Sequence, residues 1–114
     1  MQYLPMVFFL LALPAQAQEL ASGAKIKSAM SGNTVQGSMQ ASGAYTEFYA
    51  GDGTIKGADY TGSWSISGDQ MCFVYNDDPA LCWGVRIDGR QITWVGANGD
   101  EGTGNLLGGN PNGF

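Results

Sequence analysis

The chain has 114 residues and a formal net charge of −5, with five Lys and Arg against ten Asp and Glu, and it contains no histidine. The length suits one small domain. The few cations are scattered, so no basic patch can neutralise phosphates, and nucleic acid is excluded as an expected partner. Without histidine, the commonest general base and metal ligand are missing, so we expect no enzyme, no cofactor and no metal.

Residues 1–17 predict a cleavable signal peptide. They carry no charged side chain, residues 4–13 are almost wholly apolar, and residues 14–17 supply the small side chains that a signal peptidase reads. The apolar stretch is shorter than the ~20 residues that span a bilayer, so we expect no membrane anchor. The prediction is a periplasmic or secreted protein in which residues 18–114 form a single β domain with an irregular C-terminal tail.

The first predicted element of this domain is a short helix over residues 22–30. Ser22 is a suitable N-cap, Ile26 and Met30 have the i, i+4 spacing of one helical face, and Gly32 stands just past the end. The rest of the domain is expected to be strands.

Turn signals recur beyond the helix and predict an antiparallel meander of seven to eight short strands. A strand over residues 34–39 precedes a hairpin of residues 44–50 and 54–57, and the last strand covers residues 102–107. Glycines within the strands suit tight curvature, so a lipocalin-like or calycin-like barrel is favoured over a sandwich. Four dipeptides predict two-residue hairpin turns: Asp52-Gly53, Gly68-Asp69, Asp88-Gly89 and Asn98-Gly99.

The first of these turns determines which side chains of its hairpin face the core. A two-residue loop places Phe48, Ala50 and Ile55 inward. The alternate residues then face outward beside Lys56, where they form a small amphipathic patch suited to contact with a protein or a glycan. This predicted outer patch consists of Tyr45, Glu47 and Tyr49.

The next two turns predict that all three tryptophans share the inner face. The second turn sets Trp64 opposite Phe73, and the third sets Trp83 opposite Trp94. An inward aromatic set can line a cavity for one small apolar ligand, but in so short a chain we expect it to fill the barrel. This set consists of Tyr60, Trp64, Phe73, Tyr75, Trp83 and Trp94.

The connection between those hairpins sets Cys72 opposite Cys82, the two cysteines of the chain. Export favours an oxidising compartment, so a disulfide between them is predicted. The connection itself contains Asn76, Asp77 and Asp78, a candidate contact loop. These residues and Asp100-Glu101 offer oxygen ligands of the kind that bind calcium, but neither cluster has EF-hand spacing. The preference of Asp and Asn for turns explains both clusters without calcium.

Five short segments spread over most of the domain carry a resemblance to a known family: Gly32-Asn33-Thr34-Val35, Asp52-Gly53-Thr54, Met71-Cys72-Phe73-Val74-Tyr75, Cys82-Trp83 and Gly109-Asn110-Pro111. Together they resemble small uncharacterised periplasmic proteins of proteobacteria, a domain-of-unknown-function family. The resemblance implies an exported, disulfide-bearing β domain in a Gram-negative envelope, and it assigns no catalytic residues.

These features predict a monomeric, non-catalytic binding or inhibitor module that acts on a protein or glycan of the cell envelope. The alternative is a carrier that holds a small apolar ligand in a barrel cavity lined by aromatic side chains.

Overall fold

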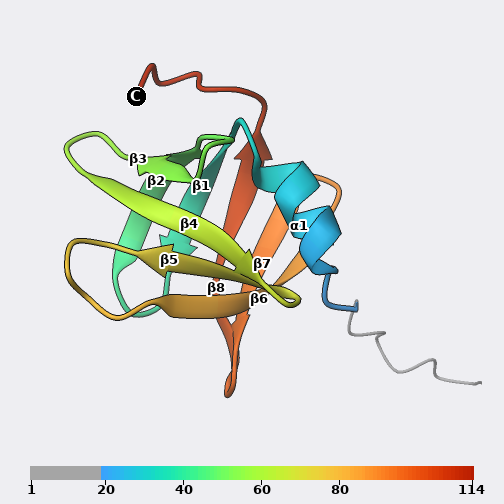
Figure 1. The fold of residues 1–114 in the computed structure, drawn as a ribbon. Coiled ribbons are helices and arrows are strands. Elements are labelled where there is room, and N and C mark those ends of the chain that lie inside the picture. Colours follow the sequence, from blue (N-terminus) through green and yellow to red (C-terminus); the bar gives the residue numbers. More distant parts are fainter. Residues whose placement is uncertain (1–18) are drawn as a thin grey trace, which may run out of the picture.

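The computed structural model describes residues 19–114, so the predicted signal peptide lies outside the described residues. The described chain forms one helix and an eight-stranded closed barrel in which every neighbouring strand pair is antiparallel (Figure 1), as the sequence predicts. Its elements are α1 (Gly23–Met30), β1 (Asn33–Met39), β2 (Gly43–Tyr49), β3 (Thr54–Lys56), β4 (Thr61–Ser67), β5 (Gln70–Val74), β6 (Leu81–Asp88), β7 (Gln91–Gly96) and β8 (Gly99–Leu107).

The predicted helix is confirmed, and α1 packs across one end of the barrel (Figure 1). The Ser22 hydroxyl accepts a hydrogen bond from the backbone N–H of Lys25, which caps the first turn. Ile26 and Met30 are fully buried, so the apolar face of α1 closes this end of the core. Within residues 19–114 no helix is long and apolar enough to cross a membrane.

The barrel closes where β1 pairs with β8. Gly37 of β1 lies directly opposite Gly104 of β8, and a Cβ atom on Gly37 would overlap the backbone of Thr103 and Gly104. The two backbones approach so closely only because neither residue has a side chain. Glycine at this pair therefore permits the curvature that brings the first and last strands together.

The central registers agree with the sequence prediction. Trp64 of β4 lies opposite Phe73 of β5 around the Gly68-Asp69 turn, and Cys72 lies opposite Cys82 across β5 and β6. The two cysteines form a disulfide with a Cα–Cα distance of 4.0 Å. The bond therefore staples two neighbouring strands of the wall.

The predicted register between β6 and β7 is wrong by two positions. The turn consists of residues 89–90, so Trp94 lies opposite Val85 and not opposite Trp83. Because the shift is an even number of positions, each strand keeps its predicted inner face, and Trp83 and Trp94 both line the interior. The β7–β8 turn likewise falls at residues 97–98, one residue earlier than predicted.

The predicted faces of β2 are reversed. The loop to β3 contains three residues, 51–53, so Ile55 lies opposite Tyr49 and not opposite Ala50. The Ala50 carbonyl accepts a hydrogen bond from the N–H of Gly53 at 3.0 Å. This bond lies within a loop that is one residue longer than the predicted two-residue turn. A one-residue slip turns a whole strand over. The predicted outer patch therefore faces the barrel interior.

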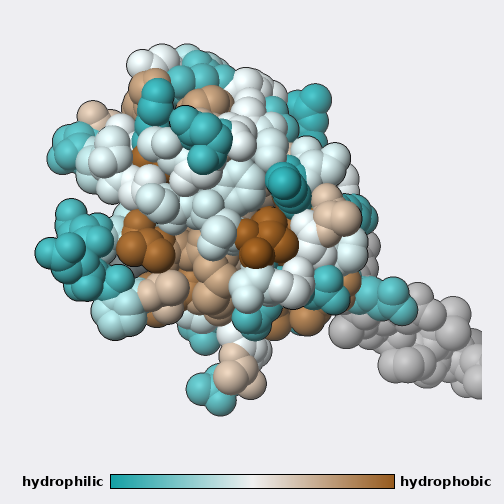
Figure 2. All heavy atoms as spheres, in the orientation of Figure 1, coloured by the Kyte–Doolittle hydropathy of each residue, from teal (hydrophilic) through white to brown (hydrophobic). Residues whose placement is uncertain are grey.

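The outer wall is largely polar. Ser63, Ser65 and Ser67 are all exposed on β4, where they alternate with less exposed residues. On the face drawn in Figure 2, hydrophobic side chains gather in a band over β4, β5 and β6, and most of the surrounding surface is hydrophilic.

The disulfide is expected to stabilise this wall measurably. Replacing both cysteines, Cys72→Ser with Cys82→Ser, should lower the free energy of unfolding by about 2–3 kcal/mol, because the ten-residue separation frees a loop in the unfolded chain. Denaturant unfolding monitored by circular dichroism measures the change, and wild-type protein treated with a reductant should match the double variant. Equal stability of oxidised and reduced protein would contradict this account.

Candidate functional site

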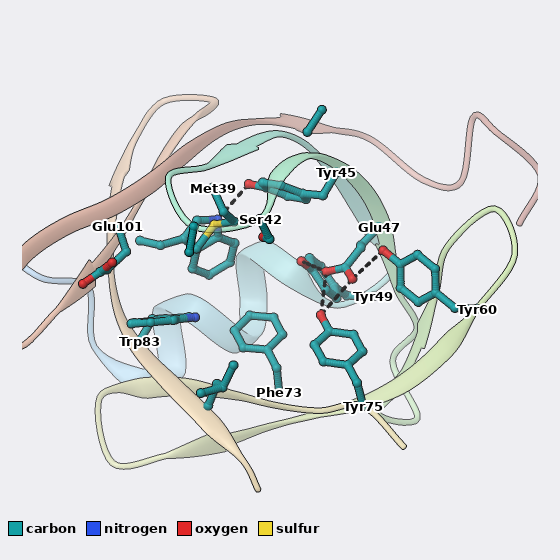
Figure 3. Close-up of a pocket in the computed structure, with 14 residues that line it drawn as sticks. Met39, Ser42, Tyr45, Glu47, Tyr49, Tyr60, Phe73, Tyr75, Trp83 and Glu101 are labelled. Atoms are coloured by element: carbon teal, nitrogen blue, oxygen red, sulfur yellow. Dashed lines mark hydrogen bonds between the residues drawn. The ribbon is translucent and has the colours of Figure 1, made fainter. Parts of the chain in front are cut away.

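A cavity of about 490 Å³ occupies the end of the barrel opposite α1. It is lined by the end of β1, the start of β2 and β6, and the residues that follow β5, so the loops at this end surround its mouth. Fourteen residues line the cavity (Figure 3), and half of them are aromatic: Tyr45, Tyr49, Tyr60, Phe73, Tyr75, Trp83 and Trp94.

The expectation that the inward aromatic set fills the barrel is therefore wrong for this half of the interior. At the α1 end, small and aliphatic side chains pack without exposure, among them Ile26, Met30, Val35 and Ile55. At the other end large rigid rings meet, some stacked as Phe73 and Tyr75 are and others edge to face as Phe73 and Trp94 are, with centroids 5.4 Å apart in the second pair. The rings leave space between them.

Trp64 is the predicted aromatic that does not line the cavity. Its indole N–H donates to the Ala50 carbonyl at 2.8 Å, and its ring meets Tyr49 edge-on. The indole therefore anchors the β2–β3 loop from within the wall.

Glu47 of β2 is the polar centre of the cavity wall. The residue is only 6% exposed, and its carboxylate accepts hydrogen bonds from three tyrosine hydroxyls (Figure 3). Tyr49 donates to Oε1 at 2.9 Å and Tyr60 donates to Oε2 at 2.7 Å. Tyr75 lies 3.0 and 2.8 Å from the two oxygens. These donors come from β2, the β3–β4 loop and the segment after β5, so one carboxylate links three parts of the cavity mouth.

The surroundings keep these tyrosines in their donating form. Burial, followed by the charge of Glu47 and the hydrogen bonds to it, raises the pKa of Tyr49 and Tyr75 well above 10.0. The same causes raise the pKa of Tyr60. At neutral pH the hydroxyls are therefore protonated, as donation to a carboxylate requires.

A second chain of hydrogen bonds runs through Tyr45, two residues before Glu47 on β2. The indole N–H of Trp94 donates to the Tyr45 hydroxyl at 2.8 Å, and that hydroxyl donates to the carbonyl of Thr103 at 3.0 Å. A Cβ atom on Gly104 would lie 2.6 Å from the Tyr45 oxygen, so glycine also makes room for this ring. Burial raises the pKa of Tyr45.

Trp83 offers a polar group to the cavity itself. Figure 3 shows its indole nitrogen turned toward the interior, and among residues 19–114 no hydrogen-bond partner is found for it. The side chain is only partly buried. Its N–H is therefore placed to meet a molecule in the cavity or water.

The lining carries acidic groups and, among the described residues, neither lysine nor arginine. Glu101 of β8 is the second acid, and Figure 3 shows its carboxylate turned away from the centre of the cavity. Within residues 19–114 the one ion pair joins Arg86 and Asp100 at 2.9 Å, and neither residue lines the cavity. Among the described residues, the negative charge of Glu47 is thus stabilised by neutral hydrogen-bond donors alone.

The predicted contact loop lies apart from the residues that line the cavity. Asn76, Asp77 and Asp78 are exposed in the β5–β6 connection and do not line the cavity. Asn76 adopts a φ of 54°, and the N–H of Asp78 donates to the Tyr75 carbonyl at 3.1 Å, which are features of a turn. In the part of the chain that the structure describes, no cluster of three or more His, Cys, Asp or Glu side chains could hold a metal ion.

The sequence predicts most of these residues as site residues, but it places the three on β2 on the outer face, whereas all three line the cavity. Glu47 and Tyr49 were expected outside and are buried in the cavity wall, and Tyr45 is half-buried beside them. Met39 and Ser42 were not predicted. Nothing in their local sequence marks them, because they reach the cavity only through closure of the barrel.

Replacing the carboxylate should change the alkaline titration of its donors. In Glu47→Gln the charge is absent, so the pKa values of Tyr49, Tyr60 and Tyr75 should fall toward 10.0, and tyrosinate should form at lower pH than in the wild type. The ultraviolet absorbance of tyrosinate, recorded with circular dichroism as a check on folding, measures this.

The same shifts predict how stability depends on pH. A folded-state pKa above the unfolded value stabilises the fold fully below pH 10.0, and that contribution is lost as the pH rises toward the folded-state pKa.

For the tyrosine titration, Glu101→Gln is the matched control, because no tyrosine donates to Glu101. If Glu101→Gln moves the tyrosine titration as far as Glu47→Gln does, the assignment to Glu47 is wrong.

In comparisons with known proteins, no protein-family model, curated protein or solved structure matches this chain.

Proposed function

We propose that this protein is an exported, non-catalytic carrier that holds one small, largely apolar molecule in its barrel cavity. The observation that carries the proposal is the cavity itself, about 490 Å³ of space at one end of the barrel with aromatic rings as half of its lining residues. Small-molecule sites have volumes of roughly 300–1,000 Å³ and combine apolar walls with a few fixed polar groups. The cavity has both properties.

The orientation of β2 removes the main argument for a module that binds a partner on its outer surface. A module that engages a protein or glycan was expected to use Tyr45, Glu47 and Tyr49 on its outer face. Two of these side chains are buried and all three line the cavity. The polar groups that could recognise a partner are thus directed toward a molecule small enough to enter the barrel.

The chemistry of the cavity wall favours binding over catalysis. The carboxylate of Glu47 already accepts hydrogen bonds at both oxygens, and the tyrosines that donate them have raised pKa values. A general base needs an oxygen free to take a proton from its substrate. Glu47 is engaged instead in holding the wall in place.

A periplasmic or secreted location is part of the proposal. The Cys72–Cys82 disulfide is the supporting observation, because such bonds persist in oxidising compartments. The apolar character of residues 4–13 is consistent with export.

The proposal predicts saturable binding of a neutral apolar probe. N-phenyl-1-naphthylamine should bind with one site per chain, and its fluorescence should be excited by energy transfer from Trp83 and Trp94, which line the cavity. Ser42→Trp adds an indole at the cavity and should weaken binding by about tenfold or more, since it occupies space that the probe needs.

Ser63→Trp is the matched control, because it adds the same indole to an exposed position of β4 outside the cavity. It should leave the affinity unchanged. Absence of saturable binding to wild-type protein, or equal weakening by both variants, would overturn the carrier proposal. Circular dichroism establishes that each variant is folded.

A further inference from the structure

The charge inside the cavity indicates which class of molecule it accepts. Glu47 is buried in the wall, and three hydroxyl groups disperse its negative charge without cancelling it. The interior of a barrel has a lower effective dielectric constant than water, so an unneutralised carboxylate attracts a cation there more strongly than it would at the surface.

No basic side chain of the described residues supplies that cation. Arg86 pairs with Asp100, and Lys56 alternates with the fully buried Ile55 on β3 and so lies on the outer face. The remaining cations, on α1 and in the β6–β7 turn at the opposite end of the barrel, are Lys25, Lys27 and Arg90. The negative potential of the cavity is therefore free to act on a ligand.

The aromatic rings provide a second attraction for a cation. Seven of the fourteen lining residues are aromatic, and Figure 3 shows the rings of Tyr45 and Trp83 nearly edge-on. The face of an aromatic ring is its negative side, and Trp, Tyr and Phe faces attract organic cations while tolerating their alkyl groups. Groups of aromatic rings recognise quaternary ammonium ligands in this way.

We infer that the ligand of this cavity is an organic cation, an alkylated ammonium group carried on an apolar body. The inference rests on the proposed carrier function and gives it a ligand class. The apolar body fits the aromatic wall, and the ammonium group lies toward Glu47. An alkylated ammonium has few or no N–H donors to satisfy, which suits a carboxylate whose oxygens already accept from tyrosine hydroxyls.

A pair of isosteric probes separates charge from shape. Benzyldimethyl(2-hydroxyethyl)ammonium and its neutral carbon analogue 3,3-dimethyl-4-phenylbutan-1-ol differ only in the nitrogen and its charge. The cation should bind wild-type protein at least about tenfold more tightly, a difference that corresponds to ~1.4 kcal/mol. Quenching of tryptophan fluorescence measures both affinities, because Trp83 and Trp94 line the cavity.

Two variants assign the preference to its sources. Glu47→Gln should abolish most of the preference for the cation while leaving the neutral analogue within about threefold of its wild-type affinity. Trp83→Leu keeps an apolar side chain but removes a ring face, so it should weaken the cation more than the neutral analogue. Glu19→Gln, an exposed position outside the cavity with the same change of charge, should alter neither affinity.

The outcomes distinguish the two proposals. If both isosteres bind equally to the wild type, the inference about charge is wrong and the carrier proposal stands. If the cation, the neutral analogue and N-phenyl-1-naphthylamine all fail to bind, the carrier proposal itself is wrong. The wild-type comparison needs no variant, so it decides the question even if Glu47→Gln does not fold.

Discussion

A carboxylate enclosed in a barrel wall has to be solvated by the protein, and this constraint organises the open half of the molecule. Leaving Glu47 without partners would cost several kcal/mol, so donors must reach it from whatever segments lie near. Tyr49, Tyr60 and Tyr75 supply them from three separate parts of the chain. The hydrogen bonds fix these rings in place, and the fixed rings hold the cavity open.

The two ends of the barrel solve different packing problems. At the α1 end, non-aromatic apolar side chains such as Ile26 and Met30 pack closely and leave no exposed surface. At the mouth, the rings are rigid and several have a polar atom that must meet a specific partner, as the Trp94 indole meets Tyr45. Rings held by such partners cannot slide together to fill the space, which gives a physical origin for the cavity.

Shape and charge support different parts of the functional account. The volume and aromatic lining of the cavity support a carrier of a small molecule and would do so for a neutral ligand as well. The buried Glu47, with no basic side chain among the lining residues that the structure describes, supports a cationic ligand. The disulfide on β5 and β6 stabilises the wall that holds Phe73 and Trp83, and so maintains the site without taking part in it.

The sequence by itself determined the features that depend on local chemistry. Ser22 and the spacing of Ile26 and Met30 specify α1, and the Gly68-Asp69 turn sets the β4–β5 register. The connection between β5 and β6 sets Cys72 opposite Cys82. Turn spacing and glycine content also predict seven to eight strands and favour a barrel over a sandwich, and the structure has eight strands in a closed barrel.

Only the tertiary structure decided which face of β2 is inside. Residues 44–50 alternate Tyr and Glu with Ala, Thr and Phe, so both faces are amphipathic, and one additional loop residue reverses them. The cavity was equally beyond the sequence. Hydrophobic periodicity reports which side chains point inward, whereas empty volume depends on how rings from distant strands meet once β1 has closed against β8.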